Sequence, residues 1–196
     1  LHSFPTRRSS DLDIPTKFAN LRAFMAYMFA HPGKKLNFMG SEFGQFKEWA
    51  FEESVEFFML QYDLHKKLWE FNKFLNNIYK ENSELFEIED SWDGFRWISA
   101  DERDNNIISF ERINKKGEKI AVIMNFSGNS YDRYRLGLDK GLYTIILNSD
   151  EKKFGGNGVI KTKTYKTAKK YAHGRENSIQ FKLPAFTALY LKKNAE

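Results

Sequence analysis

Apolar residues recur at steps of three and four in two parts of the chain, and this spacing predicts two amphipathic helices. The first begins at the capping sequence DIPT, residues 13–16, and ends at Pro32. The second covers residues 63–82 and is the strongest single signal in the sequence. The two apolar stripes consist of Phe18, Leu21, Met25, Met28 and Phe29 in the first helix and of Leu64, Leu68, Phe71, Leu75 and Ile78 in the second.

Between the two predicted helices, residues 35–39 form a short apolar run, which predicts a strand buried on both faces. The run stops at Gly40 and is followed by a polar and aromatic loop up to residue 49. A helix, a buried strand, a loop and a helix form an α/β unit, and such units place binding groups on the loop after the strand. The loop offers four candidates for substrate binding, namely Glu42, Gln45, Glu48 and Trp49.

Each loop candidate also has a structural interpretation. Glu42 and Glu48 could form a carboxylate pair for glycoside chemistry, which needs carboxyl groups about 5–10 Å apart, but Glu42 could equally close the strand by bonding to nearby backbone. The indole of Trp49 suits stacking on a sugar ring, because it is flat and apolar with a donor at its rim, and it suits packing under the loop just as well. Gln45 could bond a sugar hydroxyl or remain an exposed loop residue.

The apolar period changes near residue 82, and the chain beyond this point is predicted to be all-β. Short strands with turn residues between them are expected at residues 94–99, 106–113, 119–126, 134–138, 142–148, 159–171 and 178–191. This spacing is typical of an antiparallel sandwich or barrel. Trp92, Phe95 and Trp97 are expected in the core of the sandwich rather than as an exposed platform for sugars.

Composition removes several classes of function. The chain has no cysteine, so a disulfide framework and a thiolate metal site are both excluded, and a cytoplasmic protein is expected. No apolar run approaches the ~20 residues of a membrane helix, so no membrane partner is expected. His31, His65 and His173 are too far apart in sequence to suggest converging metal ligands, and neither a metal nor a cofactor is predicted.

Two motifs are interpreted as surface features without a binding role. The net charge is +5, and the one basic cluster lies within residues 152–170, where lysine alternates with threonine. This alternation favours the solvated side of an edge strand over a nucleic-acid surface, so no nucleic acid is expected as a partner. The run Gly155-Gly156-Asn157-Gly158 opens no predicted helix, so it indicates a flexible turn and not a phosphate cradle.

Several long motifs resemble one known family. They are KFANLRAFMAYMFAHPGKKLNFMGSEFGQFKEW, DLHKKLWEFNKFLNNIYKENSELFEIEDSWDGFRWI, VIMNFS, YRLGL, YTIILNSDEKKFGGNG and HGRENSIQFKLPAFTALYL. In this order they are similar to bacterial 1,4-α-glucan branching enzymes of the α-amylase superfamily. The resemblance implies that residues 13–82 are the last part of a (β/α)8 barrel and that residues 83–196 are a C-terminal antiparallel β-sandwich. Residues 1–12 share no pattern with the rest and are expected to be a non-native scar or a disordered arm.

The resemblance also implies an activity that this chain alone would lack. Branching enzymes cut α-1,4 links in glycogen or amylose and transfer the chain to a 6-hydroxyl, using carboxylates on earlier barrel strands that have no matching position here. The fragment is therefore expected to be inactive without the upstream part of the barrel, with its two apolar stripes facing water. Val55, Glu56 and Phe57 stand where the family usually has Leu-Asp-Trp. A glucan-binding or structural sandwich is the alternative function.

Overall fold

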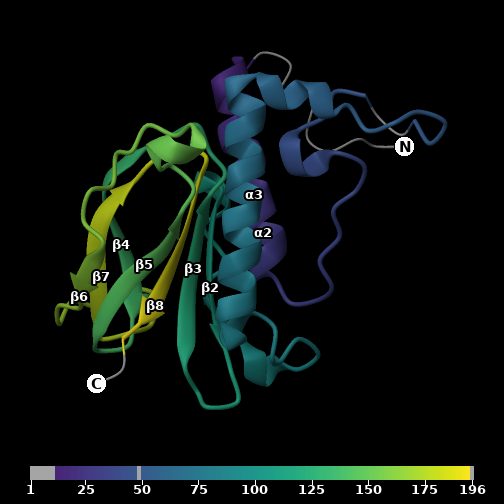
Figure 1. Cartoon of the computed structure of the whole chain (residues 1–196). Coiled ribbons are helices and arrows are strands. Elements are labelled where there is room, and N and C mark those ends of the chain that lie inside the picture. The colour runs from purple at the N-terminus through teal and green to yellow at the C-terminus, as the bar shows by residue number, and fades with distance from the viewer. Residues whose placement is uncertain (1–11, 48–49, 195–196) are drawn as a thin grey trace.

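The computed structural model describes residues 12–47 and 50–194 and shows two helices packed on one face of a β-sandwich (Figure 1). Helix α2 covers Ile14–Ala30 and helix α3 covers Asp63–Glu81. Asp13 caps α2 as predicted, with its carboxylate accepting a hydrogen bond from the Thr16 amide at 2.8 Å. Neither of these described helices is long and apolar enough to cross a membrane.

The sandwich consists of antiparallel strands in two sheets, which confirms the predicted all-β region. The larger sheet has the strand order β1-β2-β3-β8-β5-β6, and the smaller pairs β4 with β7. The strand bounds are Phe95–Ser99 for β1, Ile107–Ile113 for β2, Lys119–Asn125 for β3, Tyr131–Leu138 for β4, Leu142–Asn148 for β5, Thr164–Lys166 for β6, Asn177–Leu183 for β7 and Thr187–Lys193 for β8. Short 3-10 turns lie at Ser41–Phe43, Phe57–Gln61, Ser83–Leu85, Trp92–Gly94, Arg103–Asn105 and Lys152–Phe154.

Strand β3 is buried on both faces, and its side chains divide between two cores. Ile120, Val122 and Met124 pack with the helices, whereas Ala121 and Ile123 pack against the β4–β7 sheet. Because successive side chains on a strand point to opposite faces, a sheet covered on both sides needs a continuous apolar run in its central strand. The larger sheet is therefore the middle layer of three.

The two apolar stripes do not face water, and the expectation that they would is wrong. Phe18, Met25 and Phe29 of α2 and Leu68 and Leu75 of α3 are buried in the same core as residues of β2, β3 and β8. The outer face of the larger sheet supplies the apolar surface that a barrel would otherwise have to provide. The two helices and the larger sheet therefore share one hydrophobic core.

The predicted strand at residues 35–39 is absent, and no barrel remnant is evident among the described residues. This segment pairs with no other strand, and Leu36 and Phe38 are 76% and 54% exposed. A barrel strand is held by hydrogen bonds to parallel neighbours on either side, and no described strand pairs with residues 35–39. An apolar run by itself does not make a strand.

Two other strand predictions differ from the structure. Of residues 159–171 only Thr164–Lys166 pair, as the edge strand β6. Residues 178–191 do not form one strand but turn between β7 and β8 at Pro184, which lacks an amide to continue the ladder. Phe186 takes a positive φ of 47° within this turn.

Candidate functional site

The loop that carries the predicted binding residues is only partly described. Glu48 and Trp49 lie outside the described residues. Glu42 lies in the 3-10 turn Ser41–Phe43, and its backbone oxygen accepts a hydrogen bond of 2.8 Å from the Asn72 side chain on α3. Glu42 lines a shallow hollow together with Asn37 and Trp69. The structure thus leaves Glu42 available as a binding residue, which stays a prediction.

Gln45 is engaged within the loop. Its Oε1 atom accepts a hydrogen bond of 3.0 Å from the Glu56 amide, and its Nε2 atom donates one of 3.4 Å to the Lys47 oxygen. Gly40 lies directly beneath this side chain, since a Cβ atom at Gly40 would come within 2.6 Å of Gln45 Oε1. Gln45 therefore holds the two ends of the loop together, and its role in substrate binding remains a prediction.

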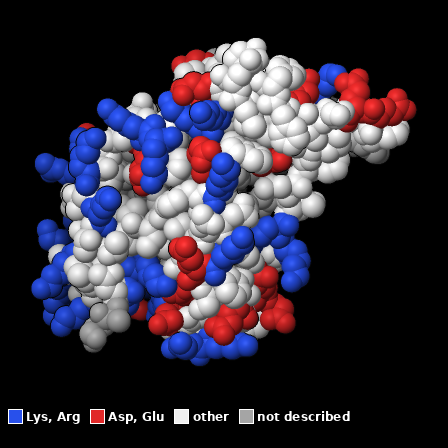
Figure 2. Space-filling view, viewed as in Figure 1, with Lys and Arg blue, Asp and Glu red and all other residues white. Residues whose placement is uncertain are grey.

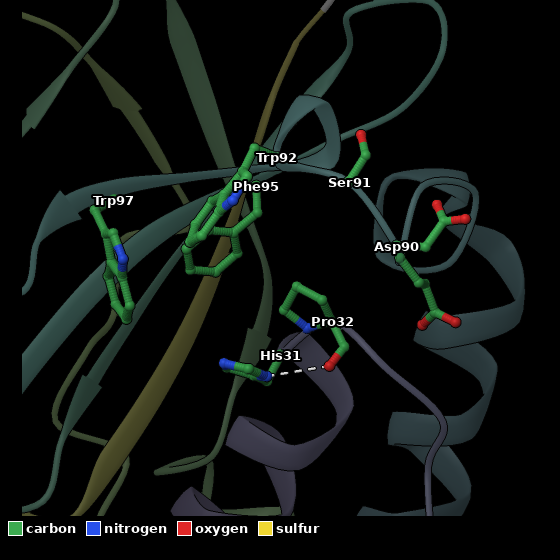
Figure 3. A pocket seen from close by; sticks show the side chains of 8 residues that line it. His31, Pro32, Asp90, Ser91, Trp92, Phe95 and Trp97 are labelled. Carbon is green, nitrogen blue, oxygen red and sulfur yellow. Dashed lines mark hydrogen bonds between the residues drawn. The ribbon is translucent and has the colours of Figure 1, made fainter.

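A second candidate site, which we call the aromatic pocket, lies where α2 ends and β1 begins (Figure 3). Its cavity is about 290 Å³, and its lining residues are His31, Pro32, Glu89, Asp90, Ser91, Trp92, Phe95 and Trp97. In Figure 3 the rings of Trp97, Phe95 and Trp92 form one side, while Pro32 and His31 lie opposite them. The pocket lies at the lower end of the size range of small-molecule sites, and its lining is largely aromatic.

Trp92 and Trp97 are not in the core, and the expectation that both would be is wrong. Trp92 is 78% exposed and Trp97 is 42% exposed, whereas Phe95 is 6% exposed and buried as predicted. Trp97 does lie on the helix-facing side of β1, but β1 is an edge strand and α2 ends at Ala30, which leaves this end of the strand partly uncovered. Trp92 lies in the turn before the strand and projects into solvent.

The exposed indoles are held by ring contacts with buried neighbours. The Trp97 ring meets Phe95 at 4.9 Å between centroids and Phe110 at 5.9 Å, each time edge to face. Trp92 meets Phe95 at 5.9 Å in the same manner. Such contacts fix the orientation of aromatic rings while leaving their outer faces open. The pocket is therefore largely formed before any ligand arrives.

The guanidinium of Arg112 holds the backbone around the pocket in place. It donates to the carbonyl oxygens of Ala30 at 2.8 Å, Ile88 at 3.0 Å and Gly94 at 3.2 Å. These three carbonyls come from α2, from the segment before β1 and from the turn at its start. Burial lowers the pKa of Arg112, and the carboxylate of Glu89 opposes this effect.

A second set of hydrogen bonds uses the ammonium of Lys35. Its Nζ atom donates to the oxygens of His31 at 2.6 Å and Gly33 at 2.7 Å, and it pairs with Glu89 at 3.3 Å. Burial lowers the pKa of Lys35, while Glu89 acts in the opposite direction. Glu89 also accepts from the Tyr79 hydroxyl at 3.1 Å, so its Oε1 atom is engaged with both Lys35 and Tyr79. Asp90 is exposed at the rim and remains available to a ligand.

Sequence reasoning missed the aromatic pocket, although one signal for it was present. Trp92, Phe95 and Trp97 lie within six residues at the start of the first predicted strand. Large aromatic residues at an edge are easily left uncovered. Within the described part of the chain, no group of acidic and histidine side chains could hold a metal ion.

The lysine-rich segment around β6 lies at one edge of the larger sheet. Lys161, Lys163 and Lys166 are exposed around β6, at the end of the larger sheet. Figure 2 shows lysine and arginine side chains gathered on the side where β6 and β7 lie in Figure 1. The expectation of a solvated edge strand agrees with this placement.

The two antiparallel sheets define the class of residues 95–193, that of an all-β sandwich domain. Residues 97–194 match the family model described as "Alpha amylase, C-terminal all-beta domain", and the chain belongs to this family. The solved structure of the α-amylase from H. orenii aligns with 90% of this chain and 36% of its own, with a TM-score of 0.58 at 15% identity. That likeness concerns the fold alone.

The curated relatives agree with the resemblance seen in the motifs. A 1,4-alpha-glucan branching enzyme GlgB 1 of Clostridium perfringens strain SM101 is 43% identical over 175 residues, which is 88% of this chain and 26% of that protein. The 1,4-alpha-glucan branching enzyme GlgB of Aquifex aeolicus is 42% identical over 178 residues, 90% of this chain and 28% of that protein. The chain spans about a quarter of the length of these relatives.

Proposed function

We propose that this chain is the C-terminal part of a 1,4-α-glucan branching enzyme, which transfers α-1,4-linked chains to 6-hydroxyls in glycogen. The observation that carries the proposal is the identity to proteins of that name over about nine tenths of the chain. Residues 13–82 are then the last helices of the barrel, and residues 83–196 are the C-terminal domain. The catalytic carboxylates lie on the missing strands, so the chain itself has no transferase activity, and the whole enzyme works in the cytoplasm.

The missing part of the barrel packs on an apolar hollow at the start of the two helices. Ile14, Phe46, Phe58 and Tyr62 line this hollow and are exposed. Figure 2 shows a largely uncharged surface around the upper end of α3 in that view, where α3 begins. Apolar surface of this kind on a folded unit marks a contact with another protein layer. Its burial would contribute roughly 25 cal/mol for each Å² removed from water.

The aromatic pocket supports a second function, that of a glucan-binding module within the same enzyme. Trp92 and Trp97 present open indole faces, which favour stacking on the apolar face of a pyranose ring. Asp90 and the His31 ring lie at the edge of the same cavity, where the hydroxyls of a stacked ring project.

Two experiments test these functions separately. The chain is incubated with amylose and the iodine colour is followed; no change is expected, and a clear loss of colour would show that the catalytic groups lie within this chain. The chain is then run through a gel containing glycogen, where retardation is expected. Trp97→Ala should abolish the retardation, while Tyr171→Ala, a control that removes an exposed aromatic ring elsewhere on the sandwich, should preserve it. Equal mobility of all three proteins with and without glycogen would contradict the binding module.

A further inference from the structure

His31 follows the last residue of helix α2 and lines the aromatic pocket, where a hydrogen bond fixes which nitrogen of the neutral ring carries the proton. Its Nδ1 atom is 3.1 Å from the carbonyl oxygen of Pro32. A carbonyl oxygen can only accept a hydrogen bond, so Nδ1 must carry the proton of the neutral imidazole. The other nitrogen, Nε2, then presents a lone pair and can act only as an acceptor.

The imidazole is held in this orientation by its neighbours. Its centroid is 5.2 Å from that of Tyr27, 6.0 Å from that of Phe95 and 6.4 Å from that of Phe110. In Figure 3 the Nδ1 edge faces the Pro32 carbonyl and the opposite ring edge faces the side on which Trp97 lies. No hydrogen bond joins Nε2 to another described residue. The ring therefore offers a fixed, unused acceptor next to an open indole.

We infer that His31 selects the sugar at the aromatic pocket by accepting a hydrogen bond from one of its hydroxyls through Nε2. This inference rests on the proposed glucan contact at the pocket and adds a residue that recognises the hydroxyl. Stacking on Trp97 is tolerant, because any flat apolar face satisfies it. A buried or half-buried acceptor at a fixed place rejects rings that lack a donor there, because its own hydrogen bond would then be unmade.

The charged groups around His31 are otherwise occupied or lie at the rim. The ammonium of Lys35 bonds the His31 and Gly33 oxygens and Glu89, and the guanidinium of Arg112 bonds three carbonyls. On α2 the ring of Tyr27 packs against the His31 ring. Only Asp90, among the charged residues that line the pocket, has an exposed carboxylate free of the Lys35 network. Beside these carboxylates, His31 Nε2 is the uncharged and directional acceptor that lines the cavity.

The test uses the full chain and maltoheptaose, with binding measured by titration calorimetry at pH 8. His31→Phe keeps an aromatic ring but has no acceptor, and it should weaken binding about three- to ten-fold. His31→Gln can place an amide oxygen near the position of Nε2 and should restore the affinity to within about two-fold of the wild-type chain. Thermal unfolding of each variant establishes that it is folded.

Each outcome has a definite meaning. Wild-type affinity for His31→Phe, or an affinity of His31→Gln as weak as that of His31→Phe, would overturn the role of His31 while leaving the glucan contact standing, provided that Trp97→Ala abolishes binding. Absence of maltoheptaose binding by the wild-type chain would overturn both the glucan contact and this inference. A weakened His31→Phe together with a His31→Gln of near wild-type affinity supports it.

Discussion

Replacing Arg112 by methionine removes the side chain that ties three segments around the aromatic pocket. The guanidinium is fully buried and donates to the carbonyl oxygens of Ala30, Ile88 and Gly94. Methionine fills a similar volume but donates nothing, so three carbonyl groups lose their partner. A buried acceptor left without a donor costs about 1–3 kcal/mol.

One opposing effect reduces the loss in the free energy of unfolding that the three unpaired carbonyls cause. Burial lowers the pKa of Arg112, which shows that the protein disfavours the charged guanidinium in this place. Methionine carries no charge and avoids that desolvation cost. We therefore expect a net loss of about 2–5 kcal/mol in the free energy of unfolding, which for a chain of this length lowers the melting temperature by roughly 5–15 °C.

Urea unfolding followed by tryptophan fluorescence measures this loss, because Trp92 and Trp97 lie next to the affected segments. Arg96→Met is the matched control, since Arg96 is an exposed arginine on the same β1–β2 hairpin and its replacement should change stability by less than about 0.5 kcal/mol. A loss of under about 0.5 kcal/mol for Arg112→Met would refute the reasoning. It would mean that water reaches the three carbonyls as soon as the guanidinium is gone.

Hydrogen exchange separates a local effect from a global one. In Arg112→Met the amides of residues 88–97 should exchange faster than in the wild-type chain, while those of the central pair β3 and β8 change only as far as global stability does. Equal acceleration throughout the chain would show that Arg112 supports the whole fold and has no particular role at the pocket.

Two further predictions concern the fold. Leu75→Ala should lower the free energy of unfolding by about 2–5 kcal/mol, because Leu75 is buried in the core between α3 and the larger sheet, and Lys66→Ala on the exposed side of α3 should have little effect in the same urea assay. Burial alone would raise the pKa of Asp139, but the hydrogen bond from Lys119 and the charges of Lys119 and Arg175 outweigh it and lower the pKa. A lowered pKa gives stability that is present above about pH 4 and is lost as pH falls below it, so Asp139→Asn should flatten the acid limb of stability against pH, and an unchanged limb would contradict this.

The helices and most strands could be predicted from the sequence because their signals are local. The α3 stripe repeats over the whole element, and β2, β3 and β5 are bounded by turn residues. The surface that covers a stripe is not a local property. The same Leu68 and Leu75 could have packed in a barrel, and only the structure shows that β3 and β8 cover them. The prediction of a strand at residues 35–39 was wrong for the same reason, because a strand needs neighbouring strands that the apolar pattern does not reveal.

The candidate site was harder to predict than the fold. Glu42 and Gln45 have polar side chains on a loop, which is where binding groups are expected, yet Gln45 uses both its amide atoms within the loop itself. Trp97 is a large aromatic residue of the kind found in protein cores, and it lies on the core-facing side of its strand. Its exposure results from two distant facts, that β1 is an edge strand and that α2 ends at Ala30. Neither fact can be read from the residues around Trp97.

The position of the two surfaces along α2 constrains how the proposed enzyme would use this chain. The apolar hollow includes Ile14 at the first residue of α2, and the aromatic pocket includes His31 just after its last. A helix of 17 residues is about 25 Å long, so the two surfaces lie roughly that far apart. A barrel that contacted this chain at the hollow alone would therefore not cover the pocket. Loss of Trp97 should weaken the hold on a long glucan while leaving the association of this chain with the rest of the barrel unchanged.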